Sequence, residues 1–214
     1  MKRYNVILFD LDGTLTNSFL GIYHGIDYAY TRHGKSIREE DVRSYIGPPL
    51  IESFARDFSP TSKVEDVIDT FREYYFAKGV YENEPYEGIP ELLERLHSAG
   101  FIIGTATSKQ QVMAEEVMRY FGLEKSVDGV FAADEKAGRV DKVDIVRYAL
   151  ECLHADANDT VLVGDTDYDI EGADLAGTHN IIVSWGFGAL GIENRAERYV
   201  TSCGELFDYL THID

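Results

Sequence analysis

Short apolar runs rich in strand-forming residues recur along the chain, and each stops abruptly at polar residues or glycines. These runs lie at residues 4–9, 101–106, 161–164 and 180–184, with a weaker one at 129–133. Continuous apolar runs of this length are typical of strands that are buried on both faces of a parallel sheet.

Amphipathic stretches separate most of these runs. They lie at residues 88–98, 109–121, 141–153 and 167–176, and their apolar positions follow the period of a helix. Strands that alternate with helices of this length form right-handed βαβ units. The pattern therefore predicts an α/β fold with a Rossmann-like parallel sheet at its core.

Residues 16–84 interrupt this alternation, because they carry helical patterns and no clear strand. One amphipathic helix is expected near 18–33, and a second apolar stripe runs from Val64 to Tyr75. The sequence Gly47-Pro48-Pro49 breaks the chain between shorter helices. A helical block inserted after the first strand is typical of a cap over an α/β core.

The predicted domain division follows from this insertion. Residues 1–16 and 85–214 are expected to form the core domain, and residues 17–84 the helical cap domain. The two linkers are expected near 16–19 and 82–87.

Composition narrows the class of protein. The chain has 214 residues, of which 44% are hydrophobic, and no apolar run reaches the length of a membrane-spanning helix. The first residues lead into a strand rather than a secretory signal. The two cysteines, Cys152 and Cys203, are expected to be reduced thiols in a cytoplasmic protein, with Cys152 in the core.

The formal net charge of −18 excludes two classes of partner. Nucleic-acid binding needs a basic surface, and anionic membranes repel an acidic protein. An anionic small molecule can still bind where local cations reverse the field. We expect a small-molecule substrate and a monomer or a weak homodimer.

The end of the first strand carries the strongest chemical signal. Asp10 and Asp12 are followed by Gly13 and Thr14, so that two carboxylates leave the strand where open α/β sheets place their ligands. A strand followed by an ordinary Asp-Gly turn is the simpler interpretation. A carboxylate can also attack phosphorus, and a second carboxyl can move the proton of the leaving group.

A second acidic motif follows the strand at 161–164. It reads Asp165-Thr166-Asp167-Tyr168-Asp169. Carboxylates packed beside Asp10 and Asp12 without a cation would be costly. Mg²⁺ prefers hard oxygen ligands from a few carboxylates, so the motif predicts a magnesium site. Asp167 is expected to be solvated.

Thr107 and Ser108 follow the strand at 101–106, before a helix expected to start near Lys109. A hydroxyl beside exposed N–H groups at a helix start can hold an anion. The alternative is that one of them is only the N-cap of that helix.

These motifs together resemble the haloacid dehalogenase superfamily of phosphatases, over essentially the whole chain. The resemblance implies that Asp10 is the nucleophile and Asp12 the general acid and base. It also implies that Asp165, Asp10 and the backbone carbonyl of Asp12 bind Mg²⁺. The segments around Thr16 and Pro85 resemble the ends of the helical cap in the phosphoglycolate phosphatase-like and 5'-nucleotidase-like subgroup.

The resemblance assigns further residues. Thr107 and the Ser108 backbone would hold the phosphoryl oxygens, and Lys142 would neutralise the phosphoryl group and Asp10. Asp169 matches the second acid of the last motif, which supports Lys142 or a metal-bound water. Lys136 and Arg139 fit the expected spacing of the lysine less well. The histidines are scattered and are not expected to act in catalysis.

The cap loop is expected to help bind substrate. Gly47 and Pro48 would lie over the bound molecule when the cap closes. The alternative is that the prolines only end one cap helix and start the next.

The predicted function is a Mg²⁺-dependent, phosphoglycolate phosphatase-like hydrolysis of a small phosphomonoester through an aspartyl-phosphate. A 5'-nucleotidase or a pyrophosphatase of the same superfamily is the main alternative. Asp12 and the second acidic motif argue against a dehalogenase, and the absence of a basic residue at 47–50 argues against a phosphosugar mutase. A non-catalytic phospho-aspartate sensor would be shorter and would lack the helical insert.

Overall fold

The computed structural model describes residues 3–212, without the side chain of Ser62. Its centre is a parallel sheet of five strands in the order β2-β1-β5-β6-β7. The strands are β1 (Val6–Phe9), β2 (Ile102–Thr105), β5 (Thr160–Gly164), β6 (His179–Val183) and β7 (Arg198–Val200). The α/β prediction with a Rossmann-like sheet is confirmed.

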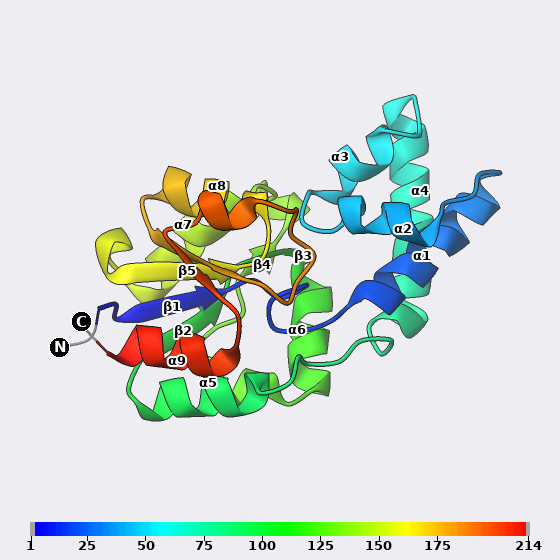
Figure 1. Ribbon diagram of the computed structural model, residues 1–214. Coiled ribbons are helices and arrows are strands. Elements are labelled where there is room, and N and C mark those ends of the chain that lie inside the picture. The colour runs from blue at the N-terminus through cyan, green and yellow to red at the C-terminus, as the bar shows by residue number, and fades with distance from the viewer. Residues whose placement is uncertain (1–2, 213–214) are drawn as a thin grey trace.

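Helices cover both faces of this sheet (Figure 1). One face carries α7 (Lys142–Leu153) and α8 (Asp167–Ala176), and the other carries α5 (Ile89–Ser98) and α9 (Cys203–Thr211). The strand β1 is buried along its whole length, which explains its continuous apolar run. Short 3-10 turns complete the core at η3 (Leu123–Ser126), η4 (Glu135–Ala137), η5 (Ala157–Asp159) and η6 (Ile192–Asn194).

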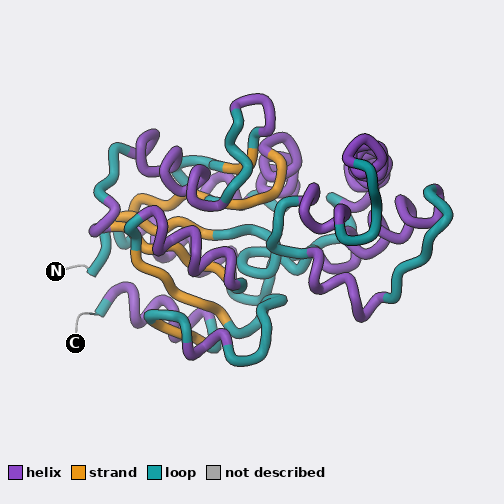
Figure 2. Tube along the Cα trace, turned by 90° about the horizontal axis from the view of Figure 1, so that it is seen from above, coloured by secondary structure: helices purple, strands orange, loops and turns teal. Residues whose placement is uncertain are grey.

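A separate block of helices lies to one side of the sheet, beyond the helix α6 (Gln111–Tyr120) in Figure 1. It comprises α1 (Phe19–Arg32), α2 (Glu39–Val42), η1 (Arg43–Tyr45), α3 (Leu50–Ala55), α4 (Thr61–Tyr74) and η2 (Tyr75–Gly79). Figure 2 shows that this block contains helices and loops but no strand. We call these residues, 19–79, the helical block.

Two neighbouring segments connect the helical block to the sheet. Thr16 pairs with Pro85 in an antiparallel bridge, and the backbone N–H of Asn17 donates to the carbonyl of Glu84 at 2.7 Å. The division into a core and a cap domain at residues 17–84 stays a prediction, but both crossings of the chain lie side by side. Such a paired connection is a suitable place for a hinge.

Two local expectations differ from the structure. After β2 the chain forms a second short strand, β3 (Thr107–Gln110), which pairs with β4 (Ala132–Ala133). The next helix therefore begins at Gln111 rather than at Lys109. Cys152 is exposed rather than part of the core, because it lies in the last turn of α7. No helix within residues 3–212 is both long and apolar enough to cross a membrane.

Candidate active site

Parallel pairing brings the ends of three strands together. Phe9 at the end of β1 pairs with Thr105 of β2 on one side and with Val163 of β5 on the other. The residues that follow these strands therefore meet at one edge of the sheet. Asp10 and Asp165 are both buried there, and Thr107 is buried beside them.

Asp10, Lys142 and Asp169 form a buried chain of ion pairs. The ammonium nitrogen Nζ of Lys142 lies 2.8 Å from Asp10 Oδ1 and 2.8 Å from Asp169 Oδ1. It also donates to the backbone carbonyl of Ala106 at 3.0 Å. Lys142 starts α7, so a helix packed on the sheet carries the cation to the end of β1.

Asp169 is fixed by the first turn of α8. Its Oδ2 accepts hydrogen bonds from the backbone N–H of Thr166 at 2.9 Å and from the Thr166 hydroxyl at 2.8 Å. This arrangement is a capping box, which leaves Oδ1 directed at Lys142. The structure thus places Asp169 where it can orient the lysine.

Asp165 is held by the loops around it. Its Oδ2 accepts from the backbone N–H of Phe187 at 2.6 Å, and its Oδ1 accepts from the Thr14 hydroxyl at 3.3 Å. Gly13 has a φ of +90°, and a Cβ at this position would lie 2.2 Å from Asp165 Oδ2. The glycine of the first motif is therefore required for both its backbone conformation and the space that Asp165 occupies.

The buried carboxylates have perturbed pKa values. Burial raises the pKa of Asp10 to about 6, although the Lys142 ammonium acts in the opposite direction. Burial, followed by the charges of Asp169 and Asp10, raises the pKa of Asp165 well above its usual range. For Lys142, burial favours the neutral form, but Asp10 and Asp169 outweigh it and raise its pKa.

This charge pattern fits a divalent cation. One carboxylate oxygen from each of Asp10, Asp165 and Asp169 lies within 4.8 Å of the others. Three carboxylates and one ammonium leave two negative charges unbalanced in a buried place. A doubly charged ion with oxygen ligands would offset them. Asp10 with Asp165 is the pair best placed to hold it, because both oxygens of Asp169 are already engaged, Oδ1 by Lys142 and Oδ2 by Thr166.

Asp12 lies apart from this cluster and makes its own ion pair. Its Oδ2 lies 2.6 Å from the Nζ of Lys109, and both side chains are largely buried. The ammonium also lies over the ring of Tyr75, 4.6 Å from the centroid. Burial lowers the pKa of Lys109, but Asp12 and Tyr75 raise it above its ordinary value.

A cavity of about 70 Å³ lies between the sheet edge and the helical block. From the sheet side it is lined by Asp10, Asp12, Thr107, Ser108, Lys109, Gln110 and Met113. From the helical block it is lined by Ile22, Tyr45, Ile46, Gly47, Pro48, Leu50, Phe71 and Tyr75. The predicted catalytic aspartates, the predicted anion-binding residues and the predicted cap loop therefore border one space.

Thr107 and Gly47 border the cavity from opposite sides, one from the sheet and one from the helical block. The hydroxyl of Thr107 accepts from the backbone N–H of Lys109 at 3.2 Å, but α6 begins only at Gln111, with Gln110 as its N-cap. Gly47 has a φ of +107°, and a Cβ there would lie 3.2 Å from Thr166. The loop of Gly47 and Pro48 thus approaches the start of α8 as well as the cavity.

Residues outside the predicted site also line the cavity. From the sequence, Lys109 is predicted only to start a helix, and Tyr75 only to belong to an apolar stripe. A lysine two positions after Thr107 is a signal that could have placed Lys109 at the site. Nothing in the spacing of Tyr75 separates it from neighbouring core aromatics. Asp167 is half exposed and pairs with Arg195, in line with a solvated position.

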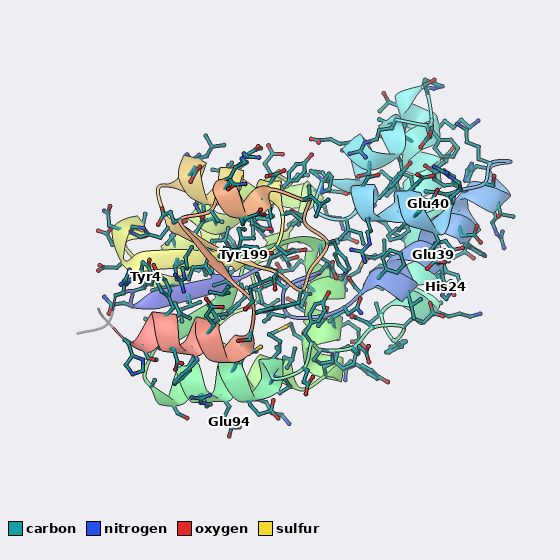
Figure 3. All side chains as sticks on the ribbon, in the orientation of Figure 1. Tyr4, His24, Glu39, Glu40, Glu94 and Tyr199 are labelled. Atoms are coloured by element: carbon teal, nitrogen blue, oxygen red, sulfur yellow. The ribbon has the colours of Figure 1, made fainter. Side chains whose placement is uncertain are left out.

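The histidines lie elsewhere. His24 lies on the helical block with Glu39 and Glu40, whereas Tyr4 and Tyr199 mark the sheet side (Figure 3). The ring nitrogen Nδ1 of His24 lies 2.9 Å from Oε2 of Glu82. None of the residues lining the cavity, within the part of the chain that the structure describes, is a histidine.

Comparisons with known proteins agree with this geometry. A 5'-nucleotidase from Pseudomonas aeruginosa is 34% identical over 208 residues, which is 95% of this chain and 93% of the relative. Tyrosine-protein kinase PtkA from Mycobacterium tuberculosis is 32% identical over 206 residues, which is 96% of this chain and 70% of that protein.

The fold has close counterparts among solved structures. A predicted phosphatase from Clostridium acetobutylicum superposes with a TM-score of 0.91 at 34% identity, covering 96% of this chain and 97% of that one. Residues 7–183 match the model of the family described as haloacid dehalogenase-like hydrolase. This span begins in β1 and ends with β6, so it includes both acidic motifs. The chain therefore belongs to the haloacid dehalogenase-like hydrolase family of enzymes.

Proposed function

We propose that this enzyme is a Mg²⁺-dependent phosphatase that hydrolyses a small phosphomonoester through an aspartyl-phosphate on Asp10. The observation that carries the proposal is the position of Asp10. Its carboxylate is buried, oriented by Lys142 at 2.8 Å, and borders a cavity that Asp12 also lines. The similarity to a 5'-nucleotidase and to a predicted phosphatase supports the same reaction class.

In the first step, a carboxylate oxygen of Asp10 attacks phosphorus and the bond from phosphorus to the leaving oxygen breaks. Asp12 donates its proton to that oxygen, so a neutral alcohol leaves. In the second step, water attacks phosphorus and gives a proton to Asp12. The bond between phosphorus and Asp10 then breaks and releases phosphate.

The other residues are proposed to bind and orient. Thr107 and the Ser108 backbone would hold phosphoryl oxygens, and Lys142 would offset their charge. Asp10, Asp165 and the Asp12 carbonyl would hold Mg²⁺, which supplies further neutralisation of the phosphoryl group when bound. Asp169 would keep Lys142 in place through the contact at 2.8 Å.

The resemblance favours a phosphoglycolate phosphatase-like enzyme, and the relative named 5'-nucleotidase favours a nucleoside monophosphate as an alternative. Pyrophosphate is included in the panel of substrates, because a pyrophosphatase is the other alternative. A phosphosugar mutase is disfavoured, because none of the described cavity residues from the helical block is basic.

The test is phosphate release from p-nitrophenyl phosphate with Mg²⁺ and with a chelator. We expect turnover that requires Mg²⁺. Borohydride added during turnover should reduce phosphorylated Asp10 to homoserine with release of phosphate, which mass spectrometry would detect. Absence of turnover of every ester by a folded protein that binds Mg²⁺ would instead favour a sensor. Turnover that is unchanged by the chelator would contradict the metal requirement.

A further inference from the structure

None of the described residues that line the cavity is a free cation. The charged residues among its described lining are Asp10, Asp12 and Lys109. Lys109 is already paired with Asp12 at 2.6 Å, and Lys142 is engaged by Asp10 and Asp169. A second anionic group on the substrate would therefore face carboxylates without a cation of its own.

The wall contributed by the helical block is largely apolar. Ile22 lies on α1, Phe71 lies on α4, and Met113 faces them from α6 on the sheet side. Ile22, Phe71 and Met113 are all buried. Burial of apolar surface against such a wall favours a leaving group with an apolar face.

One buried polar group interrupts this wall. Tyr75 is 1% exposed, and its hydroxyl donates no hydrogen bond to any acceptor within residues 3–212, although the Lys109 ammonium lies beside it. Burial raises the pKa of Tyr75 to about 12, with Lys109 acting in the opposite direction, so the hydroxyl stays protonated. An unpaired hydroxyl at a buried position is costly unless a ligand completes its hydrogen bond.

A second unpaired oxygen lies on the opposite wall. Gln110 Oε1 is buried and has no hydrogen-bond partner among the described residues, and Gln110 lines the same cavity as Tyr75. Tyr75 comes from the helical block and Gln110 from the end of β3, so a hydroxyl between them could accept from one and donate to the other.

We infer that Tyr75 and Gln110 form a leaving-group subsite for an uncharged alcohol that has an apolar face and a second hydroxyl. This inference rests on the proposed phosphatase function and narrows its substrate class. We therefore expect a lower kcat/KM for substrates whose leaving group is anionic than for esters of uncharged alcohols of similar size. Phosphoglycolate, with its carboxylate, and pyrophosphate, with its second phosphate, are such substrates.

The test compares three esters on the wild-type enzyme: 2-hydroxyethyl phosphate, ethyl phosphate and phosphoglycolate. 2-Hydroxyethyl phosphate and phosphoglycolate differ mainly at one end, where the first carries a hydroxymethyl group and the second a carboxylate. We expect kcat/KM for 2-hydroxyethyl phosphate to exceed that for phosphoglycolate by about tenfold or more, because the carboxylate would be desolvated without a partner. Equal or faster turnover of phosphoglycolate would overturn the inference and leave the phosphatase function intact.

The variant Tyr75→Phe isolates the hydroxyl. We expect the ratio of kcat/KM for 2-hydroxyethyl phosphate to that for ethyl phosphate to fall about tenfold, mainly through KM. The matched control is Tyr74→Phe, because Tyr74 donates to Glu82 instead and does not line the cavity. An unchanged ratio in Tyr75→Phe would overturn the subsite. A general loss of stability would instead lower kcat/KM for both substrates by the same factor and leave the ratio unchanged, so the stability of the variant is measured alongside.

The wild-type comparison keeps the inference testable if Tyr75→Phe does not fold. If none of the three esters and no aryl phosphate is hydrolysed by Mg²⁺-loaded protein, the proposed function itself fails and the subsite fails with it. The two failures are therefore distinguishable by whether any ester is turned over.

Discussion

Lys109 and Asp12 are 97 positions apart in the chain, yet their side chains form an ion pair in which Nζ and Oδ2 lie 2.6 Å apart. The contact joins the first acidic motif to β3, the strand that leads into α6. It also holds the carboxylate proposed to move the proton. A buried pair of this kind is costly to break from one side, since the remaining charge loses its partner.

The variant Lys109→Met is expected to lower the free energy of unfolding by about 3–5 kcal/mol, because it leaves the Asp12 carboxylate largely buried without its cation. Urea unfolding would measure this change. The double variant Lys109→Met/Asp12→Asn should recover part of the loss, since neither charge then remains. Strictly additive effects of the two substitutions would show that the pair contributes no coupling.

Asp10→Asn is expected to abolish multiple turnover of all phosphoesters while the fold is kept. The amide cannot act as the nucleophile, although it has the shape of the carboxylate. Phosphate release and circular dichroism would be measured on the same preparation. Sustained hydrolysis by this variant, after deamidation has been excluded by mass spectrometry, would remove Asp10 from its proposed role.

Asp12→Asn is expected to lose roughly 100-fold or more in kcat for alkyl phosphates, which is the usual scale of general acid–base catalysis. The loss should be smaller for aryl phosphates, because a phenolate leaves without full protonation. The measurement is a comparison of kcat across esters with different leaving groups. Equal losses for alkyl and aryl esters would argue against proton donation by Asp12.

Asp165→Asn is expected to weaken Mg²⁺ binding, because it removes one of the charges that the cation would balance. Calorimetric titration measures this affinity without any need for turnover. The matched control is Asp167→Asn, since Asp167 is half exposed and pairs with Arg195 rather than with the cluster. Equal Mg²⁺ affinity in the Asp165 variant and the wild type would contradict the ligand assignment.

The sequence was informative where local patterns carried the signal. An apolar run that ends in Asp10 and another that ends before Asp165 identify the strands, and parallel pairing then brings their ends together. Lys142 could be chosen over Lys136 and Arg139 only through the family resemblance. The structure places Lys142 Nζ 2.8 Å from Asp10, although its catalytic role stays a prediction.

Other features depend on contacts that no local pattern contains. Tyr75 has the spacing of a core aromatic, and its place beside Lys109 follows from how the helical block packs against the sheet side. Cys152 lies in an apolar helical stretch, which predicts burial, and Ala149 three positions earlier is indeed buried. The helix ends one residue later, and the thiol is exposed. End effects of this kind follow from tertiary packing rather than from periodicity.

Leu50 begins α3 at the end of the cap loop and lines the cavity beside Pro48. Leu50→Arg would introduce a cation on the wall of the helical block, where none of the described cavity residues carries a charge. We therefore expect the ratio of kcat/KM for phosphoglycolate to that for 2-hydroxyethyl phosphate to rise about tenfold, since the carboxylate gains a partner. Steady-state kinetics with both esters would measure the ratio.

The matched control for this prediction is Ile51→Arg, because Ile51 is 38% exposed and does not line the cavity. It adds the same charge one position away and should leave the ratio close to that of the wild type. A similar rise in both variants would mean that the net charge of the protein, rather than the cavity wall, controls access of anionic esters. No change in Leu50→Arg would show that the cap loop does not contact the leaving group, and the search for specificity would then move to Phe71 and Tyr75.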